Sequence, residues 1–154
     1  KKWEEAHFQF ASITSVSIIR IAPVIKKESG LIVKMSGIIK KGIGAYLGNG
    51  AQIGQWIHHN DLERIFLHVH NSELDGIVHG SAGNCTNKEL TDGIASIYDK
   101  KIWMPGIPSF IMKMMFGELA EIMLGSLEVS SDKLLESGFE FELKSVDQAL
   151  KEMK

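Results

Sequence analysis

The segment 47–62 constrains the fold most strongly, because three local signals follow one another within it. Two glycines near its start allow positive φ angles and the close approach of another group. Residues 56–58, Trp-Ile-His, predict a short strand, and Asn60 and Asp61 then offer side-chain oxygens that suit a helix N-cap. A strand end, a polar turn and a helix N-terminus are typical of the lip of a ligand crevice in an α/β protein.

Short apolar runs alternate along the chain with segments of helical periodicity. Runs at 16–21 and 76–81 predict buried strands, and a helix is predicted over 60–70. The residues expected on the buried face of that helix are Leu62, Ile65, Phe66 and Val69. This alternation predicts βα units, so we expect one α/β domain over 1–154, with short parallel or mixed strands and helices.

The remaining elements follow from caps and periodicity. A Thr-x-x-Glu capping box at Thr86 opens one helix, and a Ser-x-x-Gln pattern at Ser145 opens the last one. The other expected elements are helices at 2–11, 31–41, 109–125 and 132–138 and a half-buried strand over 139–142. In the helix at 31–41, the side chains expected to face inward are Leu31, Met35, Ile38 and Ile39.

Composition narrows the class of protein. The chain has 154 residues, of which 44 % are hydrophobic and 23 % charged, and its net charge is −2. No basic patch with interleaved aromatic residues occurs, so we expect no nucleic-acid partner. The apolar run at 110–124 is too short and too charged for a membrane span. A single cysteine, Cys85, suits a reducing compartment, and we predict a cytoplasmic location.

Two motifs carry a family resemblance. Segment 48–62 reads Gly-x-Gly-x-Gln-x-x-x-Trp-Ile-His-x-x-Asp-Leu. Segment 117–126 reads Gly-Glu-Leu-Ala-Glu-Ile-Met-Leu-Gly-Ser, and 133–141 reads Lys-Leu-Leu-Glu-Ser-Gly-Phe-Glu-Phe. In this order they resemble the C-terminal half of epimerase-like proteins of the extended short-chain dehydrogenase/reductase superfamily. These are described as NAD(P)-dependent nucleoside-diphosphate-sugar epimerases, and the second motif resembles their C-terminal extension.

The resemblance implies a Rossmann-like fold, NAD or NADP in the intact protein, and a small-molecule substrate such as a nucleotide sugar. It also implies a Gly-x-x-Gly-x-x-Gly motif and a Tyr-x-x-x-Lys pair, and this chain contains neither. Its two tyrosines, Tyr46 and Tyr98, have no lysine four residues later. We therefore interpret the chain, which begins at Lys1, as a fragment lacking the N-terminal dinucleotide-binding half. We expect it to hold no catalytic residue, to bind no cofactor alone and to be inactive alone.

Four residues are candidates for substrate binding: Gln52, Trp56, His58 and Arg20. Alternate residues of a strand share a face, so Trp56 and His58 are placed to stack on and hydrogen-bond a ring-shaped ligand. The alternative places Trp56 in the core and makes His58 a structural residue. Arg20 lies in an apolar strand, where burial without a partner is costly. We expect it to lie at a strand end or to pair with a carboxylate such as Asp61, and contact with a ligand is the alternative.

Other features favour structural roles. The six histidines lack the spacings of a metal site, so no metal is expected. Cys85 precedes a helix start, where a thiol pKa can fall, although an incidental loop cysteine is the simpler interpretation. The Met-rich segment 104–123 suits core or lid packing, or a surface that meets the missing half, a partner or another copy.

The first function hypothesis is the substrate-binding C-terminal portion of an NAD(P)-dependent sugar-nucleotide epimerase or related oxidoreductase. The alternative is a non-catalytic module that binds a small ligand or a protein through the glycine loop or the Met-rich helix.

Overall fold

Five short strands form two small sheets in the computed structural model, which describes residues 2–27 and 30–153, apart from the side chains of 30, 31, 115, 116, 119 and 122. Strand β1 (Ser17–Ile21) pairs in parallel with β4 (Gly76–Gly80). Strand β3 (Ile53–His58) pairs in parallel with β2 (Val24–Ile25) and antiparallel with β5 (Gly83–Thr86). The predicted α/β fold with parallel and mixed strands is confirmed.

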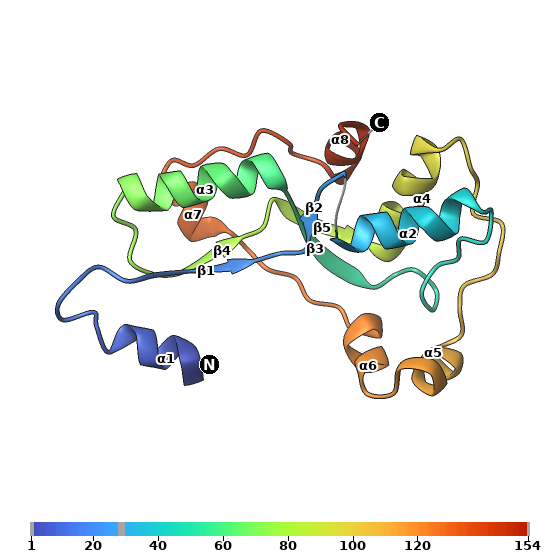
Figure 1. Ribbon diagram of the computed structural model, residues 1–154, viewed down its shortest axis with the longest axis horizontal. Helices are drawn as coiled ribbons and strands as arrows, with labels where there is room; N and C mark the ends of the chain where they lie inside the picture. The colour runs from blue at the N-terminus through green and yellow to red at the C-terminus, as the bar shows by residue number, and fades with distance from the viewer. Residues whose placement is uncertain (1, 28–29, 154) are drawn as a thin grey trace.

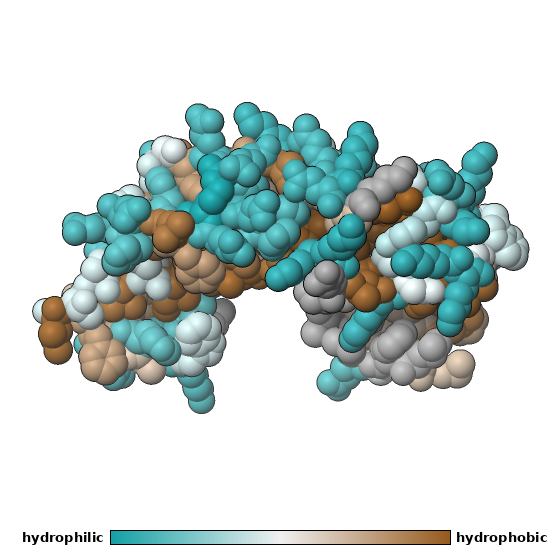
Figure 2. Space-filling view, turned by 45° about the horizontal axis from the view of Figure 1, so that its top comes forward, coloured by the Kyte–Doolittle hydropathy of each residue, from teal (hydrophilic) through white to brown (hydrophobic). Residues whose placement is uncertain are grey.

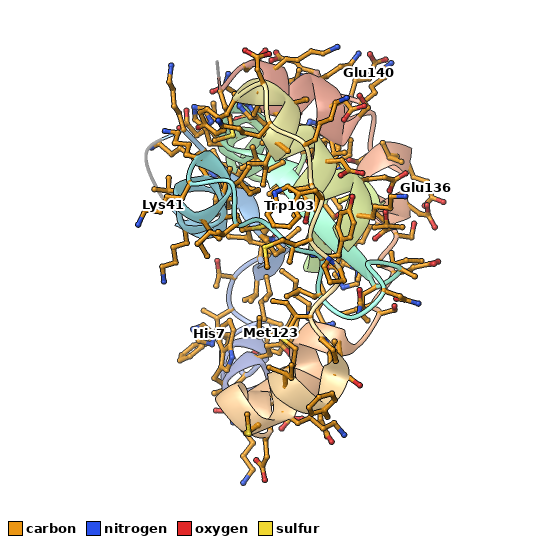
Figure 3. All side chains as sticks on the ribbon, turned by 90° about the vertical axis from the view of Figure 1, so that its right-hand side faces the viewer. His7, Lys41, Trp103, Met123, Glu136 and Glu140 are labelled. Carbon is orange, nitrogen blue, oxygen red and sulfur yellow. The ribbon has the colours of Figure 1, made fainter. Side chains whose placement is uncertain are left out.

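Helices connect and cover these strands. They are α1 (Lys2–Phe8), α2 (Gly30–Lys40), α3 (His59–Asn71), α4 (Asn87–Ile97), α5 (Ser109–Phe116), α6 (Leu119–Leu124), α7 (Asp132–Glu136) and α8 (Val146–Lys151). Figure 1 shows α3 and α8 above the strands and α2 and α4 to their right, whereas α1 and the α5–α6 pair project below. Figure 3 agrees, because His7 of α1 and Met123 of α6 lie at one end of the molecule and Glu140 at the opposite end.

The surface between the two projecting parts is hollowed, as Figure 2 shows. We call this the concave side. Large apolar side chains stay exposed on the elements that border it: Trp3, Ile21, Phe110, Met114 and Leu127, with exposed fractions between 47 % and 79 %. Exposed apolar area of this extent is uncommon on an isolated domain and is typical of a surface that meets another body.

Two apolar clusters make up the core. One gathers α2, α4 and α8 around β3, with Ile39, Trp56, Ile94 and Leu150 among its members. The other packs α3 and α7 against β1 and β4, and Val78 is fully buried within it. These five helices thus cover strand faces that are too apolar to meet water.

Helix boundaries agree with the prediction to within a few residues, but several inward-facing positions were wrong. In α3, Ile65 and Val69 are buried as expected, whereas Phe66 is 50 % exposed. In α2, Ile39 is buried and Ile38 is 52 % exposed. The predicted inward position of Leu31 lies outside the described side chains. A helical stripe is too narrow to bury both of two adjacent residues fully.

Three predicted elements differ in the structure. The single helix expected over 109–125 is two helices, because Gly117 adopts a positive φ of 57° between α5 and α6. The segment before Thr86, expected to be a loop, is strand β5. The expected strand over 139–142 has no ladder partner among the described residues, although Phe139 and Phe141 are buried there against α3 and each other.

The helix caps were predicted with mixed success. Thr86 forms the expected capping box with Glu89, and Ser145 accepts a hydrogen bond from the amide of Gln148. The expected capping of α3 by Asn60 or Asp61 is wrong, since the N-cap residue is His58 and no side chain caps it. Asp61 instead lies inside the first turn and is fully buried.

Candidate functional site

Arg20 stands at the carboxyl end of β1, where ligands usually bind in parallel sheets. Its guanidinium donates two hydrogen bonds to the carboxylate of Glu4 on α1, at 2.9 and 3.0 Å. These bonds lower the pKa of Glu4 and raise that of Arg20. The predicted pairing of Arg20 with a carboxylate is confirmed, although the partner is Glu4 and not Asp61. Since the Arg20 side chain is 46 % exposed, with Nη1 3.5 Å from Nε2 of His79, it remains accessible from solvent.

Gln52 lies just before β3, beside the glycine loop and the C-terminal end of α6. Its amide nitrogen is 2.8 Å from the position a Cβ would take on Gly48, and a methyl of Leu124 is 3.4 Å from that position. The side-chain oxygen of Gln52 is buried and accepts no hydrogen bond from any described residue. Buried amide oxygens nearly always have a partner. Gln52 therefore keeps a buried acceptor without a described partner beside the glycine loop.

Trp56 and His58 are inside the protein. Their exposed fractions are 3 % and 2 %, and Ile57 between them is fully buried. The predicted alternation is present, but helices cover both faces of β3, so alternation does not expose either side chain. The interpretation of Trp56 as a core residue fits its place in the cluster around α4 and α8.

His58 sits in a polar pocket of the core at the end of β3. Its Nε2 lies 3.7 Å from a carboxylate oxygen of Glu152, and its ring centroid is 4.3 Å from that of His59. The Nδ1 atoms of both histidines are buried without a described partner. Burial, followed by the proximity of His59, lowers the pKa of His58, so the ring is held neutral near pH 7.

Acid should destabilise the fold through His58. Its pKa is lower in the folded protein than the ordinary value of 6.5, so below pH 6.5 the unfolded chain binds a proton that folded His58 resists. The free energy of unfolding should therefore fall as pH drops below 6.5 toward the folded pKa. Replacing the exposed His70 by Gln should leave this pH dependence in place, and His58→Gln should reduce it. Urea titrations across pH 5–8 measure it, and equal slopes in both variants would contradict it.

Cys85 lies in β5 and is 7 % exposed. Burial raises the pKa of its thiol to about 11, so the low-pKa alternative is wrong. At pH 8 only about one thiol in a thousand is then ionised. We expect native protein to resist a disulfide reagent such as dithiobis(nitrobenzoate) and urea-unfolded protein to react fully. The reaction is monitored by absorbance at pH 8. A rapid reaction of the folded chain would show that the thiol is accessible and would contradict the prediction.

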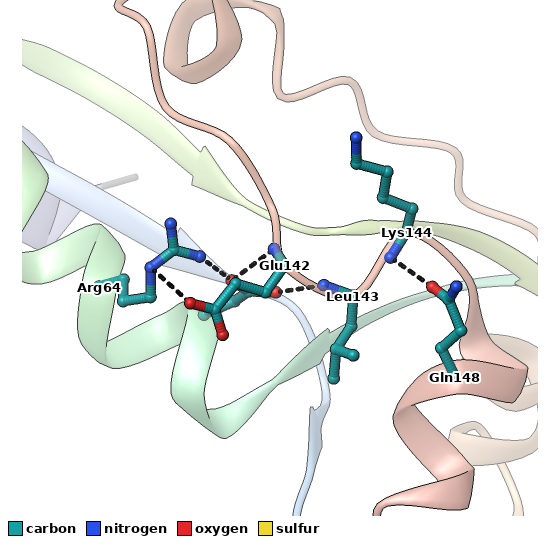
Figure 4. A network of polar contacts seen from close by, with 6 residues as sticks. Arg64, Glu142, Leu143, Lys144 and Gln148 are labelled. Atoms are coloured by element: carbon teal, nitrogen blue, oxygen red, sulfur yellow. Dashed lines mark hydrogen bonds and ion pairs between the residues drawn. The ribbon is translucent and has the colours of Figure 1, made fainter.

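Asp61 organises a polar network that the sequence did not reveal (Figure 4). Its carboxylate accepts hydrogen bonds from Nη1 of Arg64 at 2.6 Å and from the backbone amides of Glu142 at 3.1 Å and Leu143 at 3.3 Å. Arg64 also lies 3.4 Å from the Glu142 carboxylate. The network attaches the chain after α7 to the start of α3. Only the i, i+3 spacing of Asp61 and Arg64 could have indicated it.

The structure distributes the four candidates rather than gathering them. Arg20 lies by α1, Gln52 by α6, and Trp56 and His58 in the core. No group of three or more side chains suited to a metal ion occurs in residues 2–27 and 30–153. None of the helices within those ranges has the length and apolar character that crossing a bilayer requires.

The chain is similar in sequence to one protein-family model and to several epimerase family proteins. A family model described as "Domain of unknown function (DUF1731)" matches residues 107–153. The chloroplastic epimerase family protein SDR39U1 homolog of Arabidopsis thaliana is 31 % identical over 153 residues, covering 98 % of this chain and 44 % of the relative. The mouse epimerase family protein SDR39U1 is 26 % identical over 155 residues, covering 99 % and 53 %.

Solved structures of epimerases are also similar to this chain. Human epimerase family protein SDR39U1, crystallised with NADPH, superposes with a TM-score of 0.82 at 26 % identity, covering 91 % of this chain and 48 % of that one. This chain is similar to about half of each of these epimerase family proteins. UDP-N-acetylglucosamine 4-epimerase from Bacillus cereus shares the fold, with a TM-score of 0.72 at 14 % identity over 97 % of this chain and 49 % of that one.

The predicted resemblance to extended short-chain dehydrogenase/reductase proteins is confirmed, and the fold is that of their Rossmann-like structures. The chain spans about half the length of the curated relatives it matches. One relative is named as chloroplastic, so the cytoplasmic location stays a prediction.

Proposed function

We propose that this epimerase-family chain forms the substrate-side wall of an NAD(P)-dependent sugar-nucleotide epimerase or related oxidoreductase. The observation that carries the proposal is the superposition on the human protein crystallised with NADPH. It covers 91 % of this chain and only 48 % of the human chain. The sequence lacks Gly-x-x-Gly-x-x-Gly and Tyr-x-x-x-Lys, which supports a role in binding substrate rather than cofactor. The cofactor would supply the hydride chemistry, and this chain would orient the substrate.

The concave side is the proposed inner surface of that wall. The elements that border it carry exposed apolar side chains such as Trp3 and Ile21, at 61 % and 47 %, and an N-terminal half is the partner proposed to cover them. Self-association through the same surface is the outcome expected when that half is absent.

The four candidate residues take different parts in this proposal. Arg20 offers a half-exposed charged donor and Gln52 offers a buried acceptor beside the glycine loop, and both are proposed to contact substrate. Trp56 and His58 are proposed to act indirectly, because both are buried and fix the position of β3. No diphosphate-binding arginine stands near Trp56, since the nearest in sequence are Arg20 and Arg64.

NADPH binding tests the proposal. We expect the 154-residue chain to leave the fluorescence of NADPH unchanged, and the reading frame extended upstream to enhance it. The upstream sequence should encode both missing motifs. Binding of NADPH by the 154-residue chain alone would overturn the proposal. An upstream sequence without either motif would do the same and would favour the non-catalytic module.

A further inference from the structure

A pocket of about 610 Å³ opens between β5, α4 and α8, a volume typical of small-molecule sites. In Figure 1, α4 and α8 lie apart from α1 and the α5–α6 pair, the parts that project beside the concave side. The proposed function makes no use of the pocket.

The floor of this pocket carries a polar group with no internal partner. Trp56 lines the pocket and is 97 % buried, because its exposed fraction is 3 %. Its indole Nε1 donates no hydrogen bond in the described part of the chain, and it is not among the buried polar atoms that lack a partner, so solvent in the pocket reaches it. This N–H group is therefore available to donate to a molecule that enters the pocket.

Gly83 is what leaves the indole edge open. It stands directly opposite Trp56 in the antiparallel β3–β5 pair and also lines the pocket. A Cβ at Gly83 would meet Nε1 at 3.7 Å and Cε2 at 4.0 Å, which is ordinary contact distance. A side chain would therefore fit at this position and would cover the N–H group. The backbone does not require glycine at this position, since the φ angle of Gly83 is not in the left-handed region.

The rim offers hydrogen-bond donors and acceptors together. Carboxylates come from Glu89, Asp92 and Asp147, and ammonium groups from Lys144 and Lys151. The three carboxylates would repel a simple anion, and the two lysines would repel a simple cation. A hydroxyl group both donates and accepts, so it suits either kind of neighbour.

Two of these carboxylates are held in place by the protein. Glu89 accepts hydrogen bonds from Thr86 in its capping box, and Asp92 accepts one from the hydroxyl of Tyr46 at 2.6 Å. Apolar side chains complete the lining, with Leu150 the largest buried one among them. Fixed acceptors around an apolar patch match a ring that carries hydroxyls at its edge and C–H groups on its face.

We propose that this pocket binds a hydroxyl-rich ring of monosaccharide size, with one ring oxygen substituent accepting a hydrogen bond from Trp56 Nε1. This site requires neither a cofactor nor the N-terminal half. Its success or failure is therefore separate from that of the proposed function.

Indole N–H resonances test the site directly in the ¹⁵N-labelled 154-residue chain. Glucose and myo-inositol serve as hydroxylated rings, with inorganic phosphate and glycine as probes of the other ligand classes. The three indole signals are assigned with Trp56→Phe, Trp3→Phe and Trp103→Phe variants. We expect a saturable shift with a hydroxylated ring at Trp56 only, because Trp3 and Trp103 are 61 % and 74 % exposed elsewhere.

Gly83→Val is the blocking variant, and Gly54→Val is its matched control. Gly54 lies in the same strand pair opposite Cys85, and a Cβ there meets nothing within 4 Å. We expect Gly83→Val to weaken ring binding at least tenfold while Gly54→Val binds as the unchanged chain does. Thermal unfolding of both variants confirms that they are folded. The proposal is overturned if neither ring gives a saturable Trp56 shift, if phosphate or glycine gives the larger one, or if Gly83→Val binds normally.

Discussion

Asp61→Ala should destabilise the protein by about 3 kcal/mol, the typical cost of removing one partner of a buried, hydrogen-bonded charge pair. The carboxylate is fully buried and accepts hydrogen bonds from Arg64 and from the amides of Glu142 and Leu143. Arg64 is 38 % exposed in its side chain and can return to water. The two amides cannot, because the segment that carries them packs against the start of α3.

Urea unfolding measures this loss, and Glu63→Ala is the control on the same helix. Glu63 is exposed, so its replacement should change the free energy of unfolding by no more than about 0.5 kcal/mol. Amide exchange at 142 and 143 should also accelerate in Asp61→Ala and stay slow in the control. A stability equal to that of Glu63→Ala would mean that the network does not attach this segment.

The sequence predicted correctly those structural features that depend only on residues close together in the chain. The Thr86–Glu89 capping box and the alternation of strands and helices were both predicted, because periodicity and caps act within one or two turns. Phe139 and Phe141 were predicted to be buried on alternate positions, and they are. Whether such a segment finds a strand partner depends on distant residues, so the predicted strand was wrong.

The candidate site was harder to predict, because side-chain partners come from far along the chain. Arg20 pairs with Glu4 on α1, and nothing in the spacing of sixteen residues selects Glu4 over Asp61. Trp56 and His58 share a strand face as predicted, but the cover that α4 and α8 give to β3 is a tertiary property. The sequence could identify the family from its motifs without showing which residues of those motifs reach the surface.

Gly106→Ala should destabilise the protein by about 3 kcal/mol, at the upper end of the cost of overpacking. A Cβ at Gly106 would lie 1.8 Å from the carbonyl oxygen of Gly48 and 3.0 Å from its carbonyl carbon. Both obstructing atoms belong to the backbone, so no side chain can rotate to make room.

The chain around Gly106 must therefore move away from the glycine loop, with consequences beyond stability. Ile107 donates its amide hydrogen to Tyr46 at 2.8 Å and accepts from the amide of Gly48 at 2.9 Å. Both bonds should break, so hydrogen exchange at Gly48 and Ile107 should accelerate in Gly106→Ala. Because Gln52 lies against this loop, the proposed substrate contact would lose its support at the same time.

Gly37→Ala supplies the matched control, since it makes the same chemical change where there is space. Gly37 lies within α2, and a Cβ there meets nothing within 4 Å. Alanine restricts the unfolded chain and favours a helix, so this variant should be more stable by about 0.5–1 kcal/mol. Urea unfolding should thus give opposite signs for the two substitutions. If Gly106→Ala also stabilises the protein, the 46–50 loop and the 105–107 segment do not pack as closely as the structure shows.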